Sequence, residues 1–144
     1  WARETYGLSD QARFVDHSGL GDASRISAID MVTALRAALG EGTLRALLKS
    51  HPMRDEDRRI IKQHPVKVEA KTGTLNFVSA LAGYCTATDG TEMAFAILTA
   101  DVPRRDALTM AERERPEGGR TWITRSKKLQ QRLLQRWGQA FVNT

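Results

Sequence analysis

The fold is decided by residues 66–99, which read VKVEAKTGTLNFVSALAGYCTATDGTEMAFAILT. In its first part, two valines alternate with Lys67 and Glu69, and a period of two is typical of a strand with one buried face. A longer apolar stretch follows, and Asp89-Gly90, a dipeptide typical of tight turns, separates it from another apolar run. These residues predict three antiparallel strands, with the last two joined by a hairpin.

Helices are predicted on both sides of this region of the sequence. Ser27 is a favourable N-cap with Asp30 at the third helical position, and apolar residues at helical spacing follow as far as Gly40, where we expect the helix to end. A shorter helix is predicted over residues 44–49. The stripes expected to face the core are Ile29, Val32, Leu35 and Leu39 in the first helix, and Leu129, Leu133 and Trp137, with Leu134 and Phe141 beside them, in a C-terminal helix. Helices flanking an antiparallel sheet indicate the α+β class.

The composition limits the possible classes of protein. The chain has 144 residues, of which 41% are hydrophobic and 27% charged, which is typical of one soluble globular domain. The net charge of +5 favours acidic partners without identifying one. With one cysteine, Cys85, no internal disulfide is possible, and we expect this thiol to be buried and inert. The three histidines lack paired metal-ligand spacing, so we expect neither a metal nor a cofactor.

Lys71-Thr72-Gly73 is the tripeptide with the clearest chemical meaning. On a strand at the edge of a cleft, the Lys71 ammonium would give a carboxylate ligand a fixed positive potential, and the Thr72 hydroxyl could donate a hydrogen bond to it. Gly73 carries no side chain that would block a peptide lying along the strand. The backbone N–H of Thr74 could donate to a carbonyl oxygen under nucleophilic attack. Alone, the tripeptide favours the simpler interpretation, an exposed strand start with a solvated lysine.

Two blocks of sequence add context to this tripeptide. The segments 68–75 and 78–84 hold AKTGTL followed by LAGY, and upstream lie Asp16–Leu20 and then Arg25–Ala28 at the start of a predicted helix. Both blocks resemble the class C low-molecular-mass penicillin-binding proteins, which are serine D-alanyl-D-alanine carboxypeptidases and endopeptidases. Residues 40–65 depart from the family pattern, as do single positions of the upstream block (His17, Gly21, Asp22 and Ser24).

The resemblance implies a fold, an activity and a site. The fold would be the C-terminal half of a penicillin-binding, β-lactamase-like transpeptidase domain. The activity would be removal of terminal D-Ala from peptidoglycan stem peptides, with acylation by β-lactams, in the periplasm or otherwise outside the cytoplasm. Lys71 would be catalytic and Thr72, Gly73 and Thr74 would bind substrate, whereas Asp16–Leu20 would form a turn beside the cleft. No nucleic acid partner is implied.

The nucleophile of such an enzyme is missing from this sequence. None of the seven serines is followed three places later by lysine, and none is followed two places later by asparagine, so the Ser-x-x-Lys and Ser-x-Asn elements are both absent. In the family these elements precede the Lys-Thr-Gly strand. We therefore expect residues 1–144 to be the C-terminal part of one domain, inactive alone, whose nucleophile-bearing part lies upstream.

Two other functions remain open at the level of sequence. A β-lactamase would share the Lys-Thr-Gly strand, although the Asp16–Leu20 block argues against it, and it would turn over a chromogenic β-lactam rapidly. A non-catalytic basic module would use the positive residues of the C-terminal helix and would bind polyanions in a salt-dependent way. No nucleic-acid-binding motif supports that second alternative.

Overall fold

The computed structural model describes residues 1–19 and 23–140. Its centre is an antiparallel sheet with strand order β1-β2-β3-β4. The strands are β1 (Lys49–Ser50), β2 (Lys67–Leu75), β3 (Val78–Thr86) and β4 (Glu92–Ala100). The three strands predicted within residues 66–99 are therefore confirmed as β2, β3 and β4, and the architecture is the expected combination of antiparallel sheet and flanking helices.

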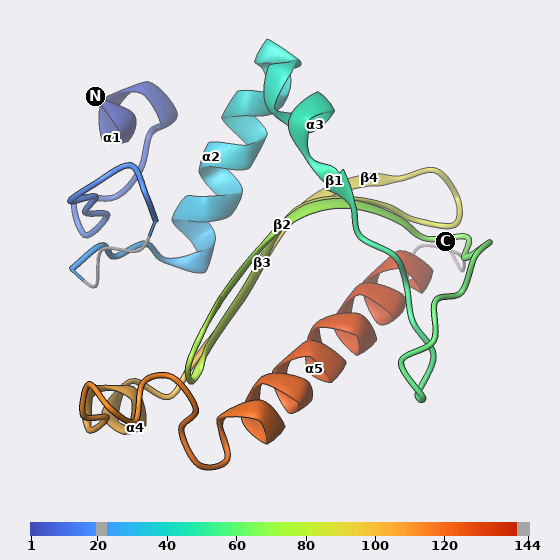
Figure 1. Ribbon diagram of the computed structural model, residues 1–144. Coiled ribbons are helices and arrows are strands. Elements are labelled where there is room, and N and C mark those ends of the chain that lie inside the picture. The colour runs from blue at the N-terminus through green and yellow to red at the C-terminus, as the bar shows by residue number, and fades with distance from the viewer. Residues whose placement is uncertain (20–22, 141–144) are drawn as a thin grey trace.

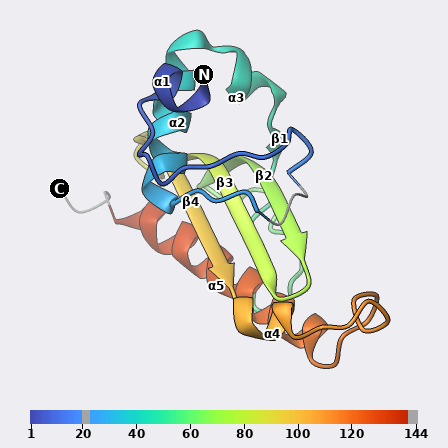
Figure 2. The same cartoon turned by 90° about the vertical axis from the view of Figure 1, so that its left-hand side faces the viewer.

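Helices cover the two faces of the sheet (Figure 1). The helices are α1 (Ala2–Tyr6), α2 (Ala28–Glu41), α3 (Thr43–Leu47), α4 (Val102–Asp106) and α5 (Gly119–Gln139). α2 and α3 lie on one face and α5 crosses the other, while α4 lies near the end of the sheet where β2 turns into β3 (Figures 1 and 2). Within the described ranges, no helix is long and apolar enough to cross a membrane.

The hairpin between β2 and β3 is as tight as the one predicted between β3 and β4. Pairing is one-to-one from Lys67 opposite Thr86 to Leu75 opposite Val78, which leaves Asn76-Phe77 as a two-residue turn. Phe77, the second residue of the turn, has a positive φ of 56°, as a type II turn requires at that position. The turn could not be predicted from the sequence because Phe, unlike Gly or Asn, rarely adopts a positive φ. At the predicted Asp89-Gly90 turn, Gly90 has a φ of 91°.

The main hydrophobic core lies between the sheet and α5. It is formed by Met53, Val66, Val68, Ala70, Leu81, Cys85, Phe95, Ile97 and Leu134. Cys85 is 1% exposed, as expected of a buried thiol, and burial raises its pKa. On the opposite face, the buried Tyr84 hydroxyl donates to the backbone oxygen of Leu35 in α2 at 2.6 Å. The two faces of β3 are thus anchored to different helices.

The predicted core-facing stripe of α5 is confirmed in part. Leu133 and Trp137 are partly buried and pack against the core, whereas Leu129 is 46% exposed. The buried residues of the helix are Gly119, Ser126, Gln130, Leu134 and Gly138. A Cβ on Gly138 would lie 2.4 Å from a methyl of Val66, so the glycine allows the helix to approach the sheet closely. Gln130 donates to the buried Ser79 hydroxyl at 3.0 Å. Phe141, also assigned to the predicted stripe, lies outside the described residues.

The apolar stripe and the end of α2 also need correction. Leu35 is buried, but Ile29 is 76% and Leu39 40% exposed, because the buried side of the helix passes through Asp30, Leu35 and Ala38 instead. The helix continues through Gly40 and ends at Glu41. Gly42 has a φ of 72°, and its N–H donates to the backbone oxygen of Leu39, so it forms the left-handed cap that we expected at Gly40.

The predicted N-cap of α2 is confirmed and it links the helix to the preceding segment. The Ser27 hydroxyl accepts from the backbone N–H of Asp30 at 3.0 Å. The buried Asp30 carboxylate accepts from the Ser9 backbone N–H at 2.8 Å, the Ser9 hydroxyl at 2.8 Å and the Ser27 hydroxyl at 2.7 Å. These bonds, the one from the Ser9 backbone foremost, hold the pKa of Asp30 below its ordinary value.

This carboxylate makes stability dependent on pH in the acid range. A pKa lowered by folding contributes stability that is present above the ordinary Asp value of about 3.9 and is lost as the pH falls through the folded value. We expect the Asp30→Asn variant to lose less unfolding free energy between pH 6 and pH 3 than the unsubstituted protein. Urea unfolding at several pH values measures the difference. Equal losses in the two proteins would show that Asp30 has no part in acid unfolding.

Candidate functional site

Lys71, Thr72, Gly73 and Thr74 lie together on β2 at an uncovered edge of the sheet. β1 pairs only with Glu69 and Ala70. β1 runs antiparallel to β2, so the residue before it, Leu48, would lie opposite Lys71, but there the chain is only leaving the end of α3. From Lys71 onwards, no strand of the described ranges therefore covers the outer edge of β2. The strand that carries the predicted site is thus paired on one side and open on the other.

The hydrogen-bonding direction of β2 places the backbone groups of Thr72 and Thr74 at this open edge. The His51 N–H donates to the Val68 oxygen at 2.8 Å, so the backbone groups of Val68 face outwards. Because these directions alternate along a strand, those of Thr72 and Thr74 face outwards too, and those of Lys71 and Gly73 face β3. The Thr74 N–H therefore points from the open edge, as an oxyanion donor requires.

The side chains of the four residues divide between the two faces of the sheet. Val68 and Ala70 pack in the core beneath α5, so Thr72 and Thr74 face the same way. The Lys71 side chain starts on the side of α2 and α3. It bends towards the open edge, where its amine donates to the backbone oxygen of Thr72 at 2.7 Å. Lys71 and Thr72 can thus meet one ligand only along the edge itself, because the body of the strand separates their side chains.

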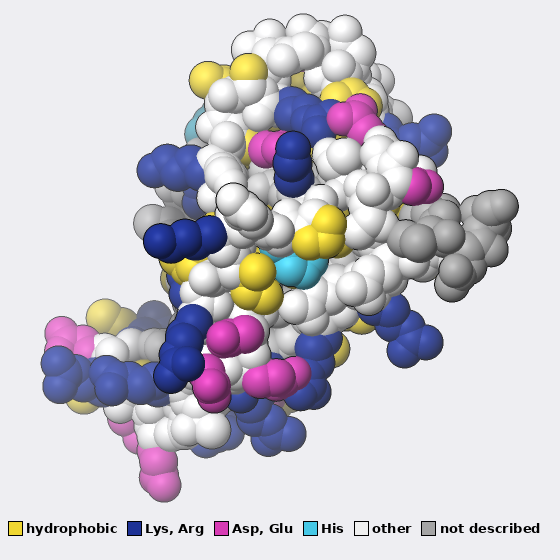
Figure 3. All heavy atoms as spheres, turned by 90° about the vertical axis from the view of Figure 1, so that its right-hand side faces the viewer, with side chains coloured by type: hydrophobic (Ala, Val, Ile, Leu, Met, Phe, Trp, Pro, Cys, Tyr) yellow, Lys and Arg dark blue, Asp and Glu magenta, His cyan; other side chains and the backbone are white. Residues whose placement is uncertain are grey.

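A groove borders the two threonines on the α5 side. It has a volume of about 740 Å³ and lies between the end of β2, α5 and the segment 51–61. Its charged lining comprises Arg54, Asp55, Glu56, Asp57, Arg58, Lys127, Lys128 and Arg132. Figure 3 shows this side of the molecule, where a group of Asp and Glu side chains lies among scattered Lys and Arg side chains. The mixture of charges gives the groove no single preferred class of ligand.

His51, Gln130 and Gln131 also line this groove, and none of them was predicted to belong to the site. The His51 Nε2 lies 3.1 Å from the Gln131 Nε2. Burial lowers the pKa of His51, and the positive charges of Arg54 and Lys127 lower it further, which favours the neutral imidazole. About eighty residues separate His51 from Gln131, and no motif connects the two. Nothing in the sequence therefore predicts that they lie in one groove.

The upstream block predicted to form a turn lies on the α2 side of the sheet (Figure 1). Asp16 Oδ1 accepts from the backbone N–H groups of Ser18 at 3.0 Å and Gly19 at 3.1 Å, the arrangement of an Asx turn. The predicted turn is therefore confirmed as far as Gly19, and the remaining residue of the block, Leu20, lies outside the described residues.

Comparison with known protein families shows which family this chain belongs to. A model of the D-Ala-D-Ala carboxypeptidase 3 (S13) family matches residues 4–116, which is most of the chain. The chain belongs to this family. The match includes the Asp16 turn, all four strands and the Lys71–Thr74 segment, and it ends just before α5. No curated protein matches the chain closely enough to add an individual relative.

Gly73 has no packing reason to be a glycine in this S13 carboxypeptidase. A Cβ there would meet only the Cβ of Ala80 at 3.5 Å, which is an ordinary contact. By contrast, a Cβ on Gly83 in β3 would lie 2.1 Å from the Glu69 oxygen, so the sheet itself requires that glycine. Packing within the chain thus explains Gly83, whereas Gly73 leaves room for a ligand or another backbone to approach the exposed strand closely.

Proposed function

We propose that this chain supplies the substrate-binding strand of a serine D-Ala-D-Ala carboxypeptidase of the class C penicillin-binding type. Its substrates are peptidoglycan stem peptides, which place the enzyme outside the cytoplasm, and β-lactams acylate it. Endopeptidase cleavage of peptide cross-links is a second activity of the same site. The observation that carries the proposal is the open edge of β2 at Lys71–Thr74 in a chain of the carboxypeptidase family.

The nucleophile belongs to a part of the protein outside this sequence, because no serine here has a lysine three places later. Its hydroxyl oxygen attacks the carbonyl of the penultimate D-Ala, and the peptide bond breaks when the leaving amine takes a proton. Water then hydrolyses the acyl-serine and frees the shortened peptide. The segment described here binds the substrate and stabilises the charge that develops on the carbonyl oxygen.

The roles of the β2 residues follow from their positions. The substrate lies along the open edge, with its terminal carboxylate at the Lys71 amine and the Thr72 hydroxyl. Its scissile carbonyl is then near the outward N–H of Thr74, which donates to the oxyanion. The Lys71 and Thr72 side chains extend from opposite faces of β2. A ligand that lies along the edge of the strand can contact both of them.

Labelling with a fluorescent penicillin tests the proposal directly. The intact protein is incubated with the probe, separated on a denaturing gel and analysed by intact mass, and release of D-Ala from a stem-peptide substrate is assayed in parallel. A stable covalent adduct together with D-Ala release supports the proposal. Rapid turnover of a chromogenic β-lactam would instead indicate a β-lactamase. No adduct and no D-Ala release from a folded intact protein would overturn the proposal.

The Gly73→Ala substitution separates substrate binding from folding. Since a Cβ fits at this position, we expect the midpoint of thermal unfolding to stay the same or rise slightly. The added methyl group displaces a ligand on the strand, and an error of about 1 Å in position can cost about 100-fold in rate. Penicillin acylation kinetics measure the effect. Gly40→Ala, where a Cβ meets open space, is the matched control and should acylate normally.

A further inference from the structure

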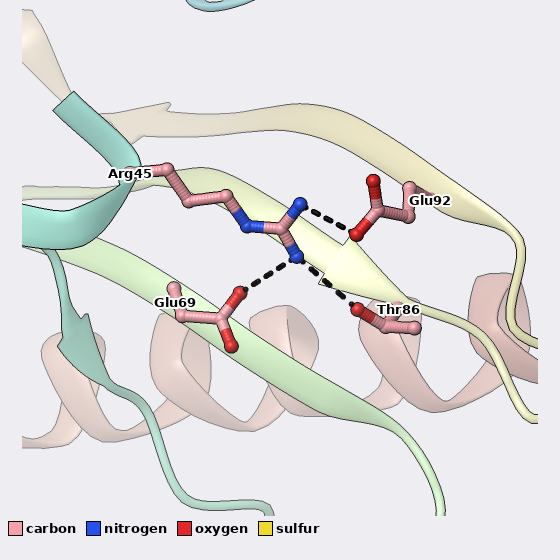
Figure 4. Close-up of polar contacts among 4 residues, drawn as sticks. All are labelled: Arg45, Glu69, Thr86 and Glu92. Atoms are coloured by element: carbon pink, nitrogen blue, oxygen red, sulfur yellow. Dashed lines mark hydrogen bonds and ion pairs between the residues drawn. The ribbon is translucent and has the colours of Figure 1, made fainter. Parts of the chain in front are cut away.

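Arg45 in α3 binds two carboxylates on the face of the sheet that carries Lys71 (Figure 4). Its Nη1 lies 2.6 Å from Glu92 Oε1 in β4, and its Nη2 lies 3.2 Å from Glu69 Oε2 in β2. Nη2 also donates to the Thr86 hydroxyl of β3 at 3.4 Å. A single guanidinium thus joins all three long strands.

The surroundings of Arg45 make these contacts stronger than those of an ordinary surface pair. Its side chain is only 24% exposed, and its guanidinium carbon lies 5.4 Å from the centre of the Tyr84 ring. The hydrogen bond with Glu92 contributes most to raising the pKa of Arg45, so the guanidinium stays charged at every relevant pH. The Glu69 carboxylate is therefore held towards α3 by a permanent cation.

Glu69 would otherwise compete for the amine that the proposed function requires. Glu69 and Lys71 are two residues apart on one strand, so their side chains share a face and their Cα atoms are about 6.6 Å apart. A lysine stem is long enough to bridge that distance. In the described residues, however, Lys71 forms no ion pair, and its amine rests on the Thr72 oxygen at the open edge.

We propose that Arg45 is a positioning residue: by holding Glu69, it keeps the Lys71 amine available for the substrate carboxylate. The inference rests on the proposed function, because it takes Lys71 as the carboxylate-binding residue. Arg45 itself does not touch the substrate. Its effect passes through Glu69, which forms an ion pair with Lys71 as soon as the guanidinium is removed.

Kinetics of the intact carboxypeptidase test this inference. For Arg45→Met we expect KM for a stem-peptide substrate to rise about two- to fivefold with kcat little changed, because an exposed competing ion pair weakens substrate binding by about that factor. Removing the competitor as well, in Arg45→Met/Glu69→Gln, should return KM to the unsubstituted value. Glu92→Gln is the matched control, since it removes a partner of Arg45 but leaves Glu69 held.

The double variant distinguishes this role from a merely structural one. If Arg45 only fastens α3 to the strands, the double variant lacks that fastening too and stays as impaired as Arg45→Met, which would overturn the inference. A KM unaffected by Arg45→Met would overturn it equally. If Arg45→Met does not fold, Arg45→Gln, which retains a polar side chain, takes its place in the same comparison.

A second readout is independent of enzymatic activity. Acetic anhydride modifies amines that are free to react, so a new ion pair that holds the Lys71 amine against Glu69 should slow its acetylation. Peptide mass spectrometry should show slower modification of Lys71 in Arg45→Met and recovery in the double variant. An unchanged rate in Arg45→Met contradicts the inference. Absence of D-Ala release and penicillin labelling in the unsubstituted protein, by contrast, counts against the proposed function alone.

Discussion

Replacing Lys71 by alanine should lower the rate of β-lactam acylation of the intact carboxypeptidase by about 10²- to 10³-fold, the loss typical of removing one preorganised group from a site that stabilises an anion. The reason is the position of the amine at the open edge of β2, where it supplies positive charge to a carboxylate lying along the strand. The side chain is exposed and its amine contacts only the neighbouring Thr72 oxygen, so the fold should not change. Stopped-flow acylation with a fluorescent penicillin measures the rate.

Lys67→Ala provides a matched control for this substitution. Lys67 is also exposed, lies on the same strand and the same face, and pairs with Thr86 at the far end of β2. We expect it to acylate at the normal rate, because it is four residues away from the proposed carboxylate site. Near-normal acylation by Lys71→Ala would show that another cation binds the carboxylate. Equal losses in both variants would indicate a general effect of charge instead of a specific contact.

The central strands could be predicted because local sequence determines them. Alternation in residues 66–70 and the Asp89-Gly90 turn depend on neighbouring residues only, and they place β2, β3 and β4 closely. β1 could not be predicted, because its two residues become a strand only by pairing with Glu69 and Ala70, about twenty residues further along the chain. The open edge at Lys71 follows from where that pairing stops, so it too required the structure.

The site was predictable only in part, for the same reason. Lys71–Thr74 form a continuous motif on one strand, and its chemistry can be read from residue types. The opposite faces of Lys71 and Thr72 follow from strand alternation, but the face that α5 covers does not. Arg45 carries no motif, and its contacts with Glu69 and Glu92 join three separate elements, so only the folded structure brings them together.

The contrast between Leu134 and Leu129 in α5 provides the second large expected effect. Sequence periodicity assigned Leu129 to the core, yet Leu134 is the residue with no exposed surface, at the centre of the cluster between the sheet and the helix. We expect Leu134→Ala to lower the free energy of unfolding by about 2–5 kcal/mol, through lost burial and the cavity that remains. Chemical denaturation of the intact protein, followed by circular dichroism, measures this change.

The same substitution at Leu129 decides which face of α5 packs on the sheet. Leu129 is 46% exposed, so Leu129→Ala removes much less buried surface and should cost less than about 1 kcal/mol. Both variants place alanine, the best helix former, in the same helix, so helix propensity cannot cause the difference. If Leu129→Ala were the more costly, α5 would pack by the leucine stripe that periodicity favours. Gln130, Leu134 and Gly138 would then face solvent, and Gly138 would no longer be needed to let α5 approach Val66 closely.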